Sequence, residues 1–162
     1  MGWSEVGDTV CPIARALAVV GDRWTVLILR ELFLGVKRFE EFQQQTGMSP
    51  HLLSTRLKRL EAEGIVVRRP YSERPVRHEY RLTDKGLDFY PLLLGLKAWG
   101  EKWGGFAPRA RPALTLVHRN CGHPAHLRLV CPSCNEPFGP RDVNVRLGTG
   151  FAAERQARRA RA

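Results

Sequence analysis

The sequence has no apolar run that approaches the roughly 18 residues of a transmembrane helix. Residues 1–8 lack the basic and then apolar pattern of a signal peptide, so we expect a cytoplasmic protein without membrane contact. It has four cysteines in 162 residues, and their spacing does not fit a secreted disulfide framework. Acidic residues are scarce: 16 Asp and Glu accompany 26 Lys and Arg, giving a formal net charge of +10. This imbalance favours a polyanion such as nucleic acid as the partner.

Motifs of common enzymes are also missing. The sequence has no Gly-rich phosphate loop, no nucleophile elbow, no paired catalytic carboxylates and no βαβ pattern around its Cys-x-x-Cys motif. We therefore expect no enzymatic activity. A thiol oxidoreductase that uses Cys131 and Cys134 is the less favoured alternative.

The apolar residues that are present indicate a helical first part. Hydrophobic residues make up 43% of the chain, and its length suits one domain with a small appendage. Over residues 11–34 they recur every three or four positions, and Gly21 and Asp22 interrupt the pattern. Because Gly ends helices and Asp caps them, this predicts two helices joined by a tight turn.

Residues 38–64 are typical of a helix-turn-helix. A short helix ends at Gly47, Ser49 can cap the next helix, and Pro50 suits its first turn. This second helix carries an apolar stripe at helical spacing, Leu53, Leu57 and Leu60.

A hairpin and a further helix follow. Residues 65–69 and 76–82 are predicted to form strands on either side of a turn at 70–75, with a basic tip. Thr83 then caps a helix that runs towards Trp103, with a kink or restart at Pro91. The order of these elements predicts a mainly α (α+β) fold, a winged helix-turn-helix over residues 1–103.

In a winged helix, the residues opposite the core stripe of the second helix face the DNA bases. The amides at the start of that helix suit a phosphate, and the hairpin tip suits a minor groove or its phosphates. Any exposed helix carries polar residues, so this prediction depends on the order of the elements. The candidate DNA contacts are Arg38, Ser49, His51, Ser54, Thr55, Arg56, Lys58, Arg59, Arg74 and Arg77.

Several segments in residues 11–103 match a known family. They are CPIA (11–14), GDRW (21–24), ILREL (28–32), KRF (37–39), GMS (47–49), RLKRLE (56–61), YRLTDKG (80–86) and WG (99–100). Together they resemble the HxlR-type branch of the MarR-like winged-helix transcription regulators. The resemblance implies a homodimer, formed through the N- and C-terminal helices, that binds double-stranded DNA at a pseudo-palindromic operator and commonly represses. The apolar surplus at Leu92, Leu93, Leu96 and Trp103 is compatible with such a dimer.

The same resemblance implies a role for Cys11 as a sensor of oxidants or electrophiles. A thiol at a helix N-terminus, near Arg15, has the positive surroundings that such chemistry requires. The simpler interpretation is a partly buried small residue beneath the dimer helices.

A cysteine cluster follows a linker at residues 104–112. His118-x-x-Cys121 and Cys131-x-x-Cys134 are separated by nine residues, a spacing typical of two zinc knuckles. Residues 113–149 are too few to fold on their own apolar content, so we predict a zinc-ribbon-like segment with one structural zinc held by these four side chains.

Other interpretations of this cluster stay open. His123 and His126 are rival fourth ligands, and the cysteines would alternatively be free thiols or a Cys131–Cys134 redox pair. A zinc-ribbon-like tail also suits docking to RNA polymerase or to a partner regulator. Short strands are expected at residues 114–117 and 127–130, and a basic, disordered tail at 150–162.

Overall fold

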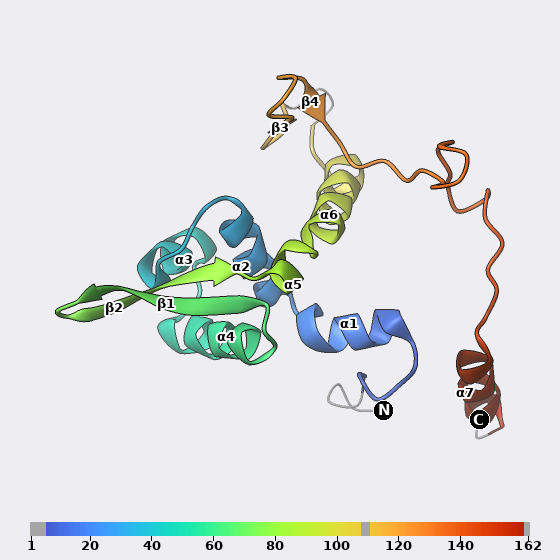
Figure 1. Ribbon diagram of the computed structural model, residues 1–162, viewed down its shortest axis with the longest axis horizontal. Coiled ribbons are helices and arrows are strands. Elements are labelled where there is room, and N and C mark those ends of the chain that lie inside the picture. Colours follow the sequence, from blue (N-terminus) through green and yellow to red (C-terminus); the bar gives the residue numbers. More distant parts are fainter. Residues whose placement is uncertain (1–5, 108–110, 161–162) are drawn as a thin grey trace. The chain divides into compact units, whose positions relative to one another are not determined.

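A computed structural model describes residues 6–107 and 111–160 (Figure 1). Its described residues form two units, one from residues 6–88 together with 146–160, the other from residues 89–107 and 111–145. The sequence instead divides the chain at the linker 104–112, of which residues 108–110 lie outside the described part. The division differs because the last long helix packs with the cysteine-rich segment: a Cβ on Gly95 would lie 3.8 Å from Leu127.

Two helices begin the first unit, as predicted. Helices α1 (Pro12–Val20) and α2 (Arg23–Phe33) are separated by Gly21 and Asp22. The Asp22 carboxylate accepts hydrogen bonds from the backbone N–H of Trp24 (3.0 Å) and Thr25 (3.2 Å), two groups that the helix leaves without partners.

The helix-turn-helix is formed by α3 (Phe39–Thr46) and α4 (Pro50–Ala62). Gly47 ends α3 in the left-handed region, with φ of 67°, which side chains with a Cβ rarely adopt. The Ser49 hydroxyl accepts a hydrogen bond from the Leu52 N–H at 3.4 Å and begins α4.

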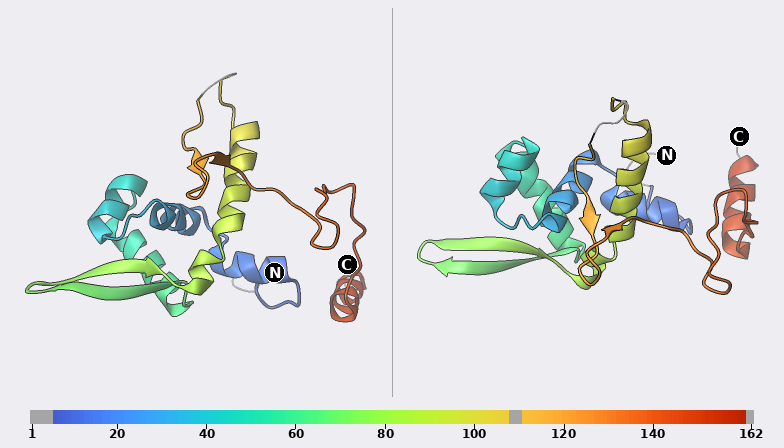
Figure 2. Two further views of the ribbon diagram at one scale, coloured as in Figure 1. Left: turned by 45° about the horizontal axis from the view of Figure 1, so that its top comes forward. Right: turned by 90° about the horizontal axis from the view of Figure 1, so that it is seen from above.

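The wing is an antiparallel hairpin of β1 (Val66–Glu73) and β2 (Val76–Leu82). The strand β1 is longer than the predicted 65–69 because a register shift between Pro70 and Ser72 accommodates the proline, which has no N–H to donate. Both views of Figure 2 show the hairpin extending past α3 and α4.

The predicted restart at Pro91 is confirmed, since a short α5 (Asp84–Leu87) precedes α6 (Tyr90–Trp103) with Pro91 in its first turn. The Thr83 hydroxyl donates to the carbonyl of Gly64 at 2.6 Å and accepts from the Gly86 N–H at 3.2 Å. Gly86 is buried so close to β1 that an added Cβ would lie 2.3 Å from the Ile65 carbonyl oxygen.

The hydrophobic core lies between α2, α3, α4 and the base of the hairpin. Phe42 packs edge-to-face on Tyr80, with ring centroids 6.2 Å apart. The buried apolar side chains are Ile28, Leu29, Leu32, Phe42, Met48, Leu53, Leu57, Leu60, Ile65 and Val66.

The C-terminal part corrects two predictions. Strand β3 (Leu116–Val117) pairs with β4 (Pro124–Ala125), and the predicted strand at 127–130 is reduced to a bridge between Val130 and Pro137. The predicted disordered tail contains a helix, α7 (Thr149–Arg159), because its Ala and Arg residues favour helix and Glu154 accepts a hydrogen bond from the Thr9 hydroxyl at 2.6 Å. Residues 161–162 lie outside the described part.

Candidate nucleic-acid interface

One face of α4 is free to contact a ligand. Leu53, Leu57 and Leu60 are buried, whereas His51, Thr55 and Lys58 are exposed at spacings of four and three residues. Ser54 is half-buried beside them. The Thr55 hydroxyl donates to the His51 carbonyl at 2.9 Å, and an exposed hydroxyl can exchange this bond for one to a base or phosphate.

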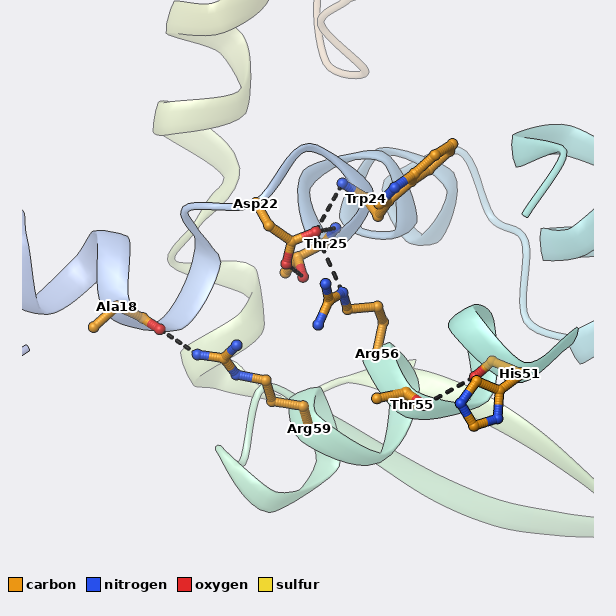
Figure 3. A network of polar contacts seen from close by, with 8 residues as sticks. All are labelled: Ala18, Asp22, Trp24, Thr25, His51, Thr55, Arg56 and Arg59. Atoms are coloured by element: carbon orange, nitrogen blue, oxygen red, sulfur yellow. Dashed lines mark hydrogen bonds and ion pairs between the residues drawn. The ribbon is translucent and has the colours of Figure 1, made fainter. Parts of the chain in front are cut away.

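The two arginines of α4 point elsewhere. Arg56 Nε lies 3.3 Å from Asp22 Oδ1, and Arg59 donates a hydrogen bond to the Ala18 carbonyl. Figure 3 shows both side chains extending from α4 towards the corner between α1 and α2. The structure therefore gives Arg56 and Arg59, which the sequence predicts as DNA contacts, an intramolecular role that holds α4 against this corner.

Asp22 is the centre of that corner. It caps α2, accepts a hydrogen bond from the Thr25 hydroxyl at 2.6 Å and pairs with Arg56. Burial raises the pKa of its carboxyl, but the hydrogen bonds from Thr25 and Trp24 and the charge of Arg56 outweigh this, so its pKa lies below the ordinary value. The carboxylate is therefore ionised at neutral pH, and its ion pair with Arg56 holds α4 against the corner between α1 and α2.

The wing presents a second positive surface. Arg68 and Arg69 on β1 and Arg74 and Arg77 at the tip are all exposed. Arg38, at the start of α3, lies with its guanidinium carbon 4.8 Å from the centre of the Tyr71 ring, which holds this charge beside the hairpin. Arg68 and Arg69 are consecutive, so they point to opposite faces of the hairpin, and both are exposed because neither face is covered at this point. The sequence-based prediction places the positive charge at the tip and does not include these two arginines, although their charge is visible in the sequence.

The predicted metal ligands form two separate pairs. His118 Nδ1 lies 3.2 Å from Cys121 Sγ. The Cys131 sulfur accepts hydrogen bonds from the backbone of Cys134 and Ser133, which lower the pKa of that thiol. Among residues 6–107 and 111–160, no three His, Cys, Asp or Glu side chains gather as a metal site, so the zinc stays a prediction.

Cys11 precedes α1 and is partly exposed. Its N–H donates to the Thr9 hydroxyl at 3.1 Å, and its carbonyl accepts from the Arg15 N–H at 3.1 Å. The thiol therefore lies at the N-terminus of α1.

The helix-turn-helix and its wing match a known family. A model described as HxlR-like helix-turn-helix matches residues 19–107, more than half of the chain. The chain belongs to the HxlR-like helix-turn-helix family. The resemblance to HxlR-type regulators that the sequence indicates is thereby confirmed. HxlR-like proteins are transcriptional regulators, not enzymes, and their helix-turn-helix implies DNA binding.

The similarity to individual proteins covers more of the chain than the family model does. This HxlR-family chain is 43% identical over 143 residues to the uncharacterized HTH-type transcriptional regulator Rv3095 of Mycobacterium tuberculosis, covering 88% of this chain and 89% of that protein. The crystal structure of PA1607, a candidate transcription factor, matches with a TM-score of 0.76 at 37% identity, covering 90% of this chain and 99% of PA1607. The redox regulator HypR in its reduced form matches with a TM-score of 0.56 at 34% identity, covering 59% of this chain and 95% of HypR.

Coverage of 88% and 90% of the chain cannot fit within residues 1–107, so the similarity to Rv3095 and PA1607 continues into the cysteine-rich segment, residues 111–145.

In the part of the chain that the structure describes, no helix is long and apolar enough to cross a lipid bilayer.

Proposed function

We propose that this HxlR-family chain is a dimeric repressor that binds a pseudo-palindromic operator. In this complex α4 lies in the major groove, and the wing contacts the sugar-phosphate backbone of the flanking DNA. The observation that carries the proposal is the exposed stripe of His51, Thr55 and Lys58 on α4, beside an arginine-rich hairpin. A helix with one buried and one polar, positively charged face has the form that major-groove readers use.

The residues of the proposed interface have different tasks. His51, Ser54, Thr55 and Lys58 face the base edges, whereas Ser49 and the first amides of α4 bind a phosphate. The DNA backbone or the minor groove is contacted by Arg38, Arg74 and Arg77. Arg56 and Arg59 are left out of this set, because their guanidinium groups are engaged with Asp22 and Ala18.

A DNA-binding measurement tests the interface. Fluorescence anisotropy compares a labelled fragment from upstream of the chain's own coding sequence with a shuffled fragment of equal length. Lys58→Ala should weaken specific binding by about 1–3 kcal/mol if Lys58 contacts a base, or reduce the salt slope by about one if it contacts a phosphate. Arg141→Ala, which removes one exposed charge from the cysteine-rich segment, is the control.

The proposal fails if the wild-type protein binds both fragments equally at every salt concentration. It also fails in part if Lys58→Ala and Arg141→Ala bind alike, because α4 would then not be the helix in the groove.

The dimer is inferred from apolar side chains that the chain leaves uncovered. On α6, Leu92, Leu96, Trp99 and Trp103 follow one another at spacings of four and three, and Trp99 is 65% exposed. On α1, Ile13 is 71% exposed. A contiguous apolar stripe of this size on a helix is typical of a protein interface, and a twofold dimer would explain a palindromic operator.

Light scattering tests the dimer. Leu96→Glu should convert a dimer into a monomer at micromolar concentration, because it places a charge within the apolar stripe. Ala98→Glu, on another face of α6, should leave the mass unchanged. A wild-type monomer would remove the dimer from the proposal.

Repression is tested by transcription from the chain's own upstream promoter in a purified system. Transcript yield should fall as protein is added and should recover with Lys58→Ala. A rise in yield would identify an activator instead.

A second candidate function is redox sensing through Cys11. The position of this partly exposed thiol at the start of α1 favours it, and HypR, a redox regulator, is among the similar structures. Diamide should then reduce operator binding by the wild type and not by Cys11→Ser, with oxidised Cys11 identified by mass spectrometry. Equal loss of binding in both proteins would exclude Cys11 as the sensor.

A further inference from the structure

The two loops that carry the paired His and Cys residues have the same backbone geometry. In the first loop, the Gly122 N–H donates to the His118 carbonyl at 2.8 Å, and the His118 N–H donates to the His123 carbonyl at 2.9 Å. Gly122, directly after Cys121, has a φ of 70°.

The second loop repeats this pattern at the same offsets. The Asn135 N–H donates to the Cys131 carbonyl at 2.8 Å, and the Cys131 N–H donates to the Glu136 carbonyl at 2.9 Å. Asn135, directly after Cys134, has a φ of 59°, in a region that residues with a Cβ rarely adopt. Two loops with unrelated intervening residues have therefore adopted the same turn, and what they share is a pair of metal-ligating side chains at each.

Each loop is held at the end of a short ladder. Strands β3 and β4 pair around the first loop, and a bridge between Val130 and Pro137 closes the second. Within each loop the two paired side chains lie close to each other. The nine residues 122–130 between the pairs reach about 30 Å when extended, so the connection allows both loops to meet at one ion.

The separation within the first pair suits a shared ion. His118 Nδ1 and Cys121 Sγ are 3.2 Å apart. Ligands about 2.0 Å and 2.3 Å from zinc at a tetrahedral angle are separated by about 3.5 Å, so a shift of a few tenths of an ångström brings this pair into position. In the second pair, the backbone amides of Ser133 and Cys134 already point at the Cys131 sulfur, as they do towards metal-bound thiolates.

The surrounding segment has little else to stabilise it. Of residues 111–145, all of which the structure describes, none is buried. Leu129 is 56% exposed and Val145 is 82% exposed. A segment of this length without a buried core requires a cross-link or a metal to keep a fixed fold.

We propose that His118, Cys121, Cys131 and Cys134 bind one zinc ion in a closed tetrahedral site. Three thiols release three protons as they bind the ion, and the neutral imidazole completes the set. In the described part of the chain the two pairs do not share one cluster, so binding draws the two loops together. Four protein ligands leave no open position for substrate, and the ion is structural.

Elemental analysis of the purified full-length protein tests the site. The wild type should contain one zinc per chain. Cys121→Ser and Cys134→Ser should each lose it, whereas Cys11→Ser, which removes a thiol outside the site, should keep it. Circular dichroism of each variant establishes that the helical part remains folded, so loss of metal is not mistaken for loss of the fold.

Cobalt titration of the metal-free protein identifies the ligands. Cobalt should saturate at one per chain, with the intense visible bands of a tetrahedral site and the thiolate charge-transfer bands of sulfur ligation. His118→Asn should weaken cobalt binding at least tenfold, whereas His123→Asn should leave it unchanged.

Two results would overturn the proposal. A wild-type protein that holds no zinc and shows no tetrahedral cobalt spectrum has no such site. If His123→Asn loses the metal and His118→Asn keeps it, the assignment of His118 is wrong.

Discussion

The helix-turn-helix with its wing and the cysteine-rich segment stabilise their folds in different ways. In the first, α2, α3, α4 and the hairpin cover one another, so Ile28, Phe42 and Leu57 are completely buried. In the second, residues 111–145 leave every side chain at least partly accessible. The first region is held by the removal of apolar surface from water, whereas the second has only short ladders, turns and its two pairs of His and Cys residues.

The largest effect is expected from metal removal, which should separate the two regions. After chelation, amides of residues 116–138 should lose their protection against hydrogen exchange, because the proposed zinc would be their main cross-link. Amides of α2 and α4 should keep theirs, and DNA binding should persist. Hydrogen exchange followed by mass spectrometry measures both regions in one sample. Equal loss of protection in both would contradict the conclusion that the two regions are stabilised in different ways.

A pair of leucine substitutions compares the two regions directly. Leu57→Ala should lower the free energy of unfolding by about 2–5 kcal/mol, because it leaves a cavity in the core. Leu129→Ala, at a half-exposed position, should change it by less than about 0.5 kcal/mol. Urea unfolding followed by tryptophan fluorescence measures both, and a large effect of Leu129→Ala would reveal a core in the second region.

A pair of glycine substitutions examines the contact that fixes the base of the wing. Gly86→Ala should cost about 1–3 kcal/mol of stability, because its Cβ would lie 2.3 Å from the Ile65 carbonyl oxygen. Gly100→Ala, within α6 and with no atom within 4 Å of the added Cβ, should stabilise by about 0.5–1 kcal/mol. Thermal unfolding measures the two changes, whose signs should be opposite.

The surface of the first region should matter for binding and not for stability. Replacing Arg74 and Arg77 together by Ala should weaken binding to operator and shuffled DNA alike and reduce the salt slope by about two, since we propose that the tip contacts phosphates. The unfolding midpoint of this double variant should match that of the wild type. Loss confined to the operator would mean that the wing reads bases.

The smallest effect concerns the Asp22 corner. Because the pKa of Asp22 is lowered on folding, its ionised form stabilises the protein above the unfolded pKa of about 4, and this contribution is lost as the pH falls through the folded pKa. Asp22→Asn should therefore be less stable than the wild type at pH 6, and the difference should shrink below about pH 4. Urea unfolding across this range measures it; a constant difference would show that ionisation is not the cause.

Much of the fold is predictable because its signals are local. The cap at Asp22, the left-handed glycine at Gly47 and the cap at Ser49 each depend on neighbours within a few residues, so the helix boundaries follow from the sequence. The tail helix α7 was missed because an isolated, polar helix is marginal in water, and its contact with Thr9 lies far away in the chain.

The sequence by itself determined the winged helix, the family and the spacing of the four His and Cys residues, because periodicity, capping and spacing are properties of short segments. Only the tertiary structure decided that Arg56 and Arg59 turn towards α1 and α2 while His51 and Lys58 face outward. Residues between the buried and the exposed faces of a helix can point either way. Their direction is settled by what packs beside them, here a carboxylate 34 residues and a carbonyl 41 residues earlier in the chain.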